Sequence, residues 1–167
     1  MLTNEDRISY LLNFYFGDYH KDPILSAVER AYLDLARTQH GFSRDIEKQQ
    51  NQEQRKSLLV ARINDIGEHQ IESQGKFDEY HKDLMLELQR LSQASFTLGQ
   101  AQKWVNMSLK YCLMIKPQVF AKNMAFYHVP IDNIVLAKLT DYNFSGKWSK
   151  LNNYDDYIHF QNWFRKK

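Results

Sequence analysis

Apolar residues recur at intervals of three and four positions along most of this chain, and this periodicity constrains the fold more than any other feature. No segment alternates apolar and polar residues for long enough to require a β-sheet. Glycines and N-capping residues separate the periodic segments, and no internal repeat or linker is visible. The sequence therefore predicts one all-α domain over residues 1–167, a compact bundle of about seven or eight helices.

The first two helices begin at capping residues. Thr3, with Asp6 three residues later, predicts a helix that ends at Gly17. We expect this helix to bury one apolar face, formed by Ile8, Leu11, Leu12 and Phe14 or Phe16. The pair Asp22-Pro23 predicts the start of a second helix, because proline is favoured at the first helical position.

Helical spacing continues along the rest of the chain. The expected segments are 58–66, 77–91, 96–114 with a turn at its start, 117–127, 133–139 and 154–164. The glutamine-rich segment 44–56 fits either an exposed helical turn or a mobile connection.

Composition favours a cytoplasmic location. Apolar residues make up 43% of the chain, enough for one buried core. The longest apolar stretch, 107–120, is interrupted by Lys110, Lys116 and Pro117, so it falls short of the roughly 20 residues of a membrane span. The N-terminus carries acidic residues and no apolar signal-peptide core, so we expect neither secretion nor a membrane partner.

Cysteine and histidine usage argues against a metal centre or cofactor. The lone Cys112 excludes an internal disulfide, a four-cysteine zinc site and an iron–sulfur cluster, and we expect it in the core. No two of the six histidines stand four residues apart with an acidic companion. The GxGxxG, P-loop, GxSxG and HExxH motifs are also absent. We therefore expect no metal and no cofactor.

Charge divides the chain into an acidic and a basic part. Residues 97–167 hold 10 basic and 4 acidic residues, a net charge of +6, whereas residues 1–96 carry a net charge of −4. Such asymmetry favours an anionic partner, with DNA or another nucleic acid first among them. Lysines that merely solvate helix faces would give the same asymmetry.

One segment of the basic part carries the most informative motif. It reads Leu98-Gly99-Gln100-Ala101-Gln102-Lys103-Trp104-Val105-Asn106-Met107, and Val129-Pro130-Ile131-Asp132 places an aspartate 29 residues after Lys103. The first stretch resembles the hairpin of the helix-hairpin-helix DNA glycosylases related to endonuclease III and 8-oxoguanine glycosylase. Gly99, Lys103 and Asn106 match the glycine, the catalytic lysine and the asparagine of that hairpin, and Asp132 matches an aspartate that opens a later helix. Leu98 and Ala101 depart from the family's proline and second glycine.

The resemblance implies base excision from DNA by a glycosylase or lyase without an iron–sulfur cluster. Lys103 would form a Schiff base with the sugar, and Asp132 would stabilise the positive charge of the transition state. Gly99, Gln100, Gln102 and Asn106 would then contact the nucleic acid. The alternative is structural, with Lys103 a solvated helix residue and Asp132 an ordinary N-cap.

Aromatic residues are dense in the basic part and could stack on bases. Trp104 and Trp163 lie at helical spacing, so we expect both in the core. Trp148 lies between Lys147 and Lys150 in a glycine-containing loop, so we expect it at the surface and assign all three to nucleic-acid binding.

Three functional hypotheses follow from the sequence. The first is a helix-hairpin-helix-like DNA-binding protein, with catalysis by Lys103 and Asp132. The second is a noncatalytic helical module that binds nucleic acid or an acidic protein, as in phage, defence or regulatory proteins; its binding would survive Lys103→Ala. The third is a self-associating interaction domain, in which the acidic part of one copy faces the basic part of another; its dimer would be sensitive to salt.

Overall fold

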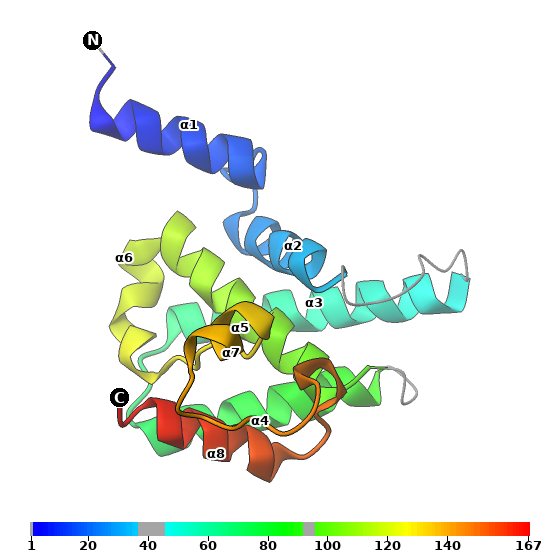
Figure 1. Cartoon of the computed structure of the whole chain (residues 1–167). Coiled ribbons are helices and arrows are strands. Elements are labelled where there is room, and N and C mark those ends of the chain that lie inside the picture. Colours follow the sequence, from blue (N-terminus) through cyan, green and yellow to red (C-terminus); the bar gives the residue numbers. More distant parts are fainter. Residues whose placement is uncertain (1, 37–45, 92–95) are drawn as a thin grey trace.

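A computed structural model describes residues 2–36, 46–91 and 96–167 as helices joined by short connections (Figure 1). No β-strand occurs within these ranges, which agrees with the predicted all-α bundle. The helices are α1 (Asn4–Phe16), α2 (Pro23–Ala36), α3 (Ile46–Glu68), α4 (Gln74–Arg90), α5 (Leu98–Ile115), α6 (Pro117–Phe120), α7 (Asn133–Lys138) and α8 (Tyr154–Phe164), with 3-10 turns η1 (Ala121–Phe126) and η2 (Trp148–Lys150).

Helix α5 is the centre of the core. Of its 18 residues, 15 are buried, and α2, α3, α4, α6 and η2 pack around it. Trp104 is fully buried, and its indole nitrogen donates to the carbonyl of Val28 on α2 at 2.9 Å. Cys112 is also buried, and burial raises the pKa of its thiol to about 12. Both residues lie in the core, as predicted.

The helix boundaries mostly follow the predicted caps. Thr3 and Asp6 form a reciprocal capping box on α1, and Asp22 accepts a hydrogen bond from the Leu25 amide at the start of α2. Asp132 caps α7 by accepting from the amides of Ile134 and Val135, each at 2.9 Å. Of the glutamine-rich segment 44–56, residues 46–56 belong to α3, while 44–45 lie outside the described residues.

Helix α1 departs from the prediction, because it projects from the bundle instead of packing into it (Figure 1). None of its residues is buried. Ile8 and Leu11 are 57% and 62% exposed, so the prediction that they are buried was wrong, whereas Leu12 is half-buried. Of the alternatives Phe14 and Phe16, Phe14 is 81% exposed and Phe16 is half-buried against the core. The C-terminal part of the helix touches the body: Leu12 is half-buried against the core, and Phe16 packs edge-on against Tyr111 of α5, with ring centroids 5.3 Å apart.

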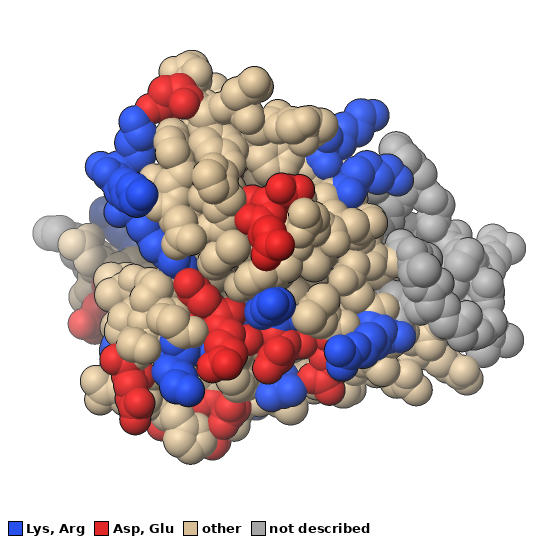
Figure 2. All heavy atoms as spheres, turned by 90° about the horizontal axis from the view of Figure 1, so that it is seen from below, with Lys and Arg blue, Asp and Glu red and all other residues tan. Residues whose placement is uncertain are grey.

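The acidic and basic parts of the sequence meet on one side of the molecule. Figure 2 shows the side from which α4 and α8 are seen, where acidic and basic side chains lie beside one another. Arg165 of the basic part pairs with Asp78 of the acidic part, with 2.6 Å between guanidinium and carboxylate. On this side of the fold, charges of the two parts therefore offset one another. No helix in the described part of the chain is long and apolar enough to cross a membrane.

Candidate functional site

Lys103 and Asp132 meet in the structure. The Lys103 ammonium lies 3.4 Å from the Asp132 carboxylate and 4.9 Å from the centre of the Trp148 ring. Their side chains are only 11% and 13% exposed. A carboxylate and an indole face are both groups that bind an ammonium ion. The pair has little open surface on which to receive an extruded base.

The amides that would hold a DNA phosphate at the start of α5 are already bonded. The Gly99 amide donates to the Leu151 carbonyl at 2.8 Å, and the Leu98 amide donates to the Asn152 side chain at 3.1 Å. The Gln100 amide donates to the capping hydroxyl of Thr97 at 3.1 Å.

The chain around η2 lies directly over this helix start. A side-chain carbon built at Gly99 would lie only 1.9 Å from the carbonyl oxygen of Trp148. The glycine is therefore needed for this close approach of two backbone segments, and in this conformation it is closed to a phosphate.

Gln102 and Asn106 are buried in a polar network. Gln102 bonds both backbone polar groups of Ile131, accepting from its amide at 3.0 Å and donating to its carbonyl at 2.7 Å. The Asn106 amide group donates to Gln102 at 3.1 Å and to the Tyr157 hydroxyl at 3.0 Å. In this conformation both side chains hold the 128–131 segment against α5 and cannot reach a nucleic acid.

The network continues to the surface through two histidines. His81 lies 2.8 Å from the Asn106 oxygen, and His128 bridges the Tyr157 hydroxyl and the Asp78 carboxylate, each at 2.7 Å. Nε2 of His128 also lies 2.6 Å from the Arg165 guanidinium, so His128, Asp78 and Arg165 meet at one point. Because the amide oxygen of Asn106 only accepts, His81 carries its proton on Nε2, and its buried Nδ1 has no hydrogen-bond partner among the described residues.

Burial keeps both histidines neutral. It lowers the pKa of His81 well below its ordinary value, and the nearby His128 lowers it further. Burial also lowers the pKa of His128, although the bond to Asp78 opposes this effect. Partial burial opposes ionisation of Asp78, but hydrogen bonds from His128, Arg165 and Gln74 hold the pKa of this carboxyl well below its usual range.

The loop residues assigned to nucleic-acid binding divide into two groups. Trp148 is 4% exposed, so its expected place at the surface was wrong. The reason is that its ring packs into the core over the Lys103 ammonium. Lys147 and Lys150 are exposed and line a hollow of about 460 Å³ together with Asn152, Asn153 and Asp156.

Two features of the structure were not predicted from the sequence. The His81–Asn106–Tyr157–His128–Asp78 chain comes from four separate segments, so no local spacing could have indicated it. The exposed apolar face of α1 has the same periodicity as a buried helix, and only the packing of the bundle tells the two apart. Within the described ranges, no group of three histidine, cysteine or acidic side chains could hold a metal ion.

Comparison with protein families, with characterised proteins and with solved structures found no match to this chain.

Proposed function

We propose that this chain is a noncatalytic helical interaction domain that self-associates through α1. The observation that carries the proposal is the exposure of large apolar side chains on a helix that has no fully buried residue: Ile8, Tyr10, Leu11 and Phe14 are 57%, 69%, 62% and 81% exposed. Exposed apolar surface concentrated in this way is typical of interaction sites.

The helix needs a partner for its own stability. It has 13 residues, and an isolated helix shorter than about 12–15 residues is marginal in water. The capping box formed by Thr3 and Asp6 stabilises its first turn but covers no apolar surface. Packing against another surface would supply the missing stabilisation.

The spacing of the apolar residues suits a second copy of the same helix. Leu11 follows Ile8 by three residues, and Phe14 follows Tyr10 by four and Leu11 by three, so these exposed side chains form one continuous side of α1. In a two-fold dimer the same stripe faces itself, so no other surface has to be complementary.

The exposed area is sufficient for a weak dimer. At about 200 Å² for each fully exposed side chain, Ile8, Tyr10, Leu11 and Phe14 offer about 500 Å² per copy. Two copies would bury about 1,000 Å², the lower limit for a specific interface. We therefore expect a dissociation constant on the order of 1–100 μM.

The polar residues of α1 disfavour a lipid surface as the partner. Its only charged residues are Glu5, Asp6 and Arg7, a net charge of −1. Helices that lie on anionic membranes carry lysine and arginine on their polar face. A protein surface fits this composition better.

Analytical ultracentrifugation tests the proposal. Wild type is compared with Leu11→Ser/Phe14→Ser, which removes the apolar face of α1, and with Leu33→Ser, a control at an equally exposed leucine (54%) on α2. We expect wild type and the control to dimerise and the double variant to stay monomeric. A wild type that is monomeric at about 1 mM, or a double variant that dimerises like wild type, would contradict the proposal.

Salt separates this proposal from association driven by charge. An apolar interface persists at about 1 M NaCl, where electrostatic attraction is screened within about 3 Å. Loss of the dimer at high salt would favour pairing of acidic and basic surfaces instead.

The hollow beside Lys147 and Lys150 supports a second candidate function, the binding of nucleic acid. Both lysines are exposed, and amide side chains of Asn152 and Asn153 lie beside them, although Asp156 reduces the local positive charge. Fluorescence anisotropy with a short DNA strand tests it. Binding that is lost in Lys147→Gln/Lys150→Gln and retained in Lys103→Ala would favour this candidate.

Base excision by Lys103 has less geometric support, because its ammonium is paired and its side chain is only 11% exposed. Borohydride trapping on DNA with an abasic site is the direct test. A covalent adduct that disappears in Lys103→Ala would restore the lyase hypothesis.

A further inference from the structure

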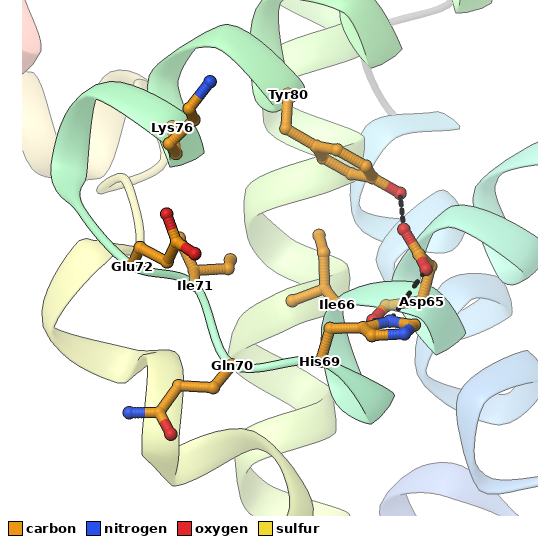
Figure 3. A pocket seen from close by; sticks show the side chains of 8 residues that line it. All are labelled: Asp65, Ile66, His69, Gln70, Ile71, Glu72, Lys76 and Tyr80. Carbon is orange, nitrogen blue, oxygen red and sulfur yellow. Dashed lines mark hydrogen bonds and ion pairs between the residues drawn. The ribbon is translucent and has the colours of Figure 1, made fainter.

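A second surface feature lies on the far side of the bundle from η2, where α3 ends and α4 begins. The hollow has a volume of about 270 Å³ and is lined by the end of α3, the connection that follows it, and the first turns of α4 (Figure 3). At about 30 Å³ per water molecule, it has room for about nine groups of that size. It is therefore suited to a small ligand.

The hollow has apolar and acidic walls. Ile66, Ile71 and the ring of Tyr80 supply apolar surface, while Asp65 and Glu72 stand on opposite sides of the opening (Figure 3). A ligand between these walls would contact apolar groups along its length and a carboxylate at its end.

Asp65 is held in place by two hydrogen-bonding neighbours. One carboxylate oxygen accepts from the Tyr80 hydroxyl at 2.9 Å, and the other lies 3.0 Å from Nδ1 of His69. Burial, reinforced by the bond to Asp65, raises the pKa of Tyr80 to about 12, so its hydroxyl keeps the proton that it donates. An ionised carboxylate has about four lone-pair sites, so Asp65 retains acceptor capacity toward the hollow.

The charges around the hollow favour a cation. Asp65 and Glu72 are acidic, whereas the last carbonyl of α3, at Glu68, already accepts from the Lys122 ammonium at 3.1 Å. Among the described residues that line the hollow, Lys76 is the only lysine or arginine, and its ammonium lies 3.6 Å from Glu79 outside it. Among the described residues, Glu72 has no ion-pair partner.

We propose that this hollow binds a small organic ammonium ion with an apolar body, which pairs its charge with Asp65 and packs its body against Ile66, Ile71 and Tyr80. The walls match the two parts of such a ligand, because the carboxylate takes the ammonium and the apolar side chains take the hydrocarbon. Binding here is independent of α1, which lies at another part of the molecule (Figure 1).

Titration of the full chain with tyramine, followed by two-dimensional NMR, tests the proposal. Tyramine combines an aromatic body with a primary ammonium. The matched ligand is 3-(4-hydroxyphenyl)propionate, which has the same ring and a carboxylate in place of the amine. We expect saturable shifts around residues 65–80 with tyramine, a dissociation constant on the order of a millimolar, and at least tenfold weaker binding of the carboxylate.

Variants identify the residue responsible. Asp65→Asn keeps an oxygen that accepts from Tyr80 but removes the charge, so we expect about tenfold weaker tyramine binding. The control, Asp155→Asn, removes an exposed carboxylate on α8 and should bind like wild type. Equal affinity for both ligands, absence of saturable shifts, or an unchanged affinity in Asp65→Asn with its fold intact would overturn the proposal.

Discussion

Helices α1 and α5 contain similar proportions of apolar residues but differ in how far their side chains are buried. In α5, polar side chains such as Gln102, Asn106 and Ser108 are buried, whereas in α1 large apolar side chains such as Leu11 and Phe14 are exposed. Residue type alone would predict the reverse. Burial of a side chain in this protein therefore depends on whether neighbouring segments surround its helix.

The physical reason differs between the two helices. Gln102 and Asn106 tolerate burial because each is hydrogen-bonded to a backbone or side-chain partner. In α1, Leu12 and Phe16 pack against the body, whereas Leu11 and Phe14 face away from it and remain in water. Exposure of that area is unfavourable by roughly 25 cal/mol per Å², which association would recover.

The largest effect on stability should come from removing a buried side chain at the centre of α5. Trp104→Ala removes the indole that packs from α5 against α2, together with its bond to the Val28 carbonyl. We expect the free energy of unfolding to fall by about 3–5 kcal/mol. Urea denaturation followed by circular dichroism measures it, and a loss of less than about 1 kcal/mol would contradict the central role of α5.

A somewhat smaller effect is expected from breaking the buried network. Asn106→Ala leaves the Nε2–H of His81 without its acceptor and removes the donor to Tyr157. Each buried polar group left unpaired costs about 1–3 kcal/mol, so we expect a loss of about 2–3 kcal/mol. Asn13→Ala, at an exposed asparagine of α1, is the matched control and should lower the free energy of unfolding by less than about 0.5 kcal/mol.

Acid should destabilise the fold by a comparable amount. The unfolded chain protonates its histidines below about pH 6.5, whereas the lowered pKa values of His81 and His128 keep them neutral in the native state. The free energy of unfolding should therefore fall by about 2 kcal/mol from pH 7 to pH 5.5. The ionised Asp78, whose pKa is also lowered, adds a further loss only below about pH 4.

Histidine variants test whether the buried histidines cause this pH dependence of the free energy of unfolding. Chemical denaturation at several pH values should show a smaller loss in His81→Gln than in wild type. His159→Gln, at an exposed histidine of α8, should leave the pH dependence unchanged. An equal slope in all three proteins would show that acid acts elsewhere.

The smallest effect on the monomer should come from α1. Phe14→Ser removes a side chain that is 81% exposed, so we expect the free energy of unfolding at low protein concentration to change by less than about 0.5 kcal/mol. The same variant should raise the dimer dissociation constant at least tenfold in sedimentation equilibrium. A large loss of monomer stability would mean that α1 packs against its own bundle.

The sequence predicted the helices better than their surroundings. Local signals were sufficient for the capping box at Thr3, the start of α2 after Asp22, and the Asp132 cap, because these interactions span only a few residues. Burial of Trp104 and Cys112 also followed from helical spacing.

Long-range packing was beyond these local signals. The exposed loop predicted around Trp148 is folded over the start of α5, and the contact with Gly99 joins residues far apart in the sequence. The proximity of Lys103 and Asp132 was expected from the family resemblance, but their near burial could not be read from spacing. The exposure of the apolar side chains of α1 could not be predicted from the sequence either, because their periodicity is that of a buried helix.

Hydrogen exchange measured over a range of protein concentrations tests most directly whether α1 is an open helix that pairs with a second copy. We predict that, at the lowest concentration, α1 amides exchange much faster than those of α5, and that their protection increases as the protein is concentrated while that of α5 stays constant. Protection of α1 that equals that of α5 at the lowest concentration, or that does not change up to about 1 mM, would contradict the account.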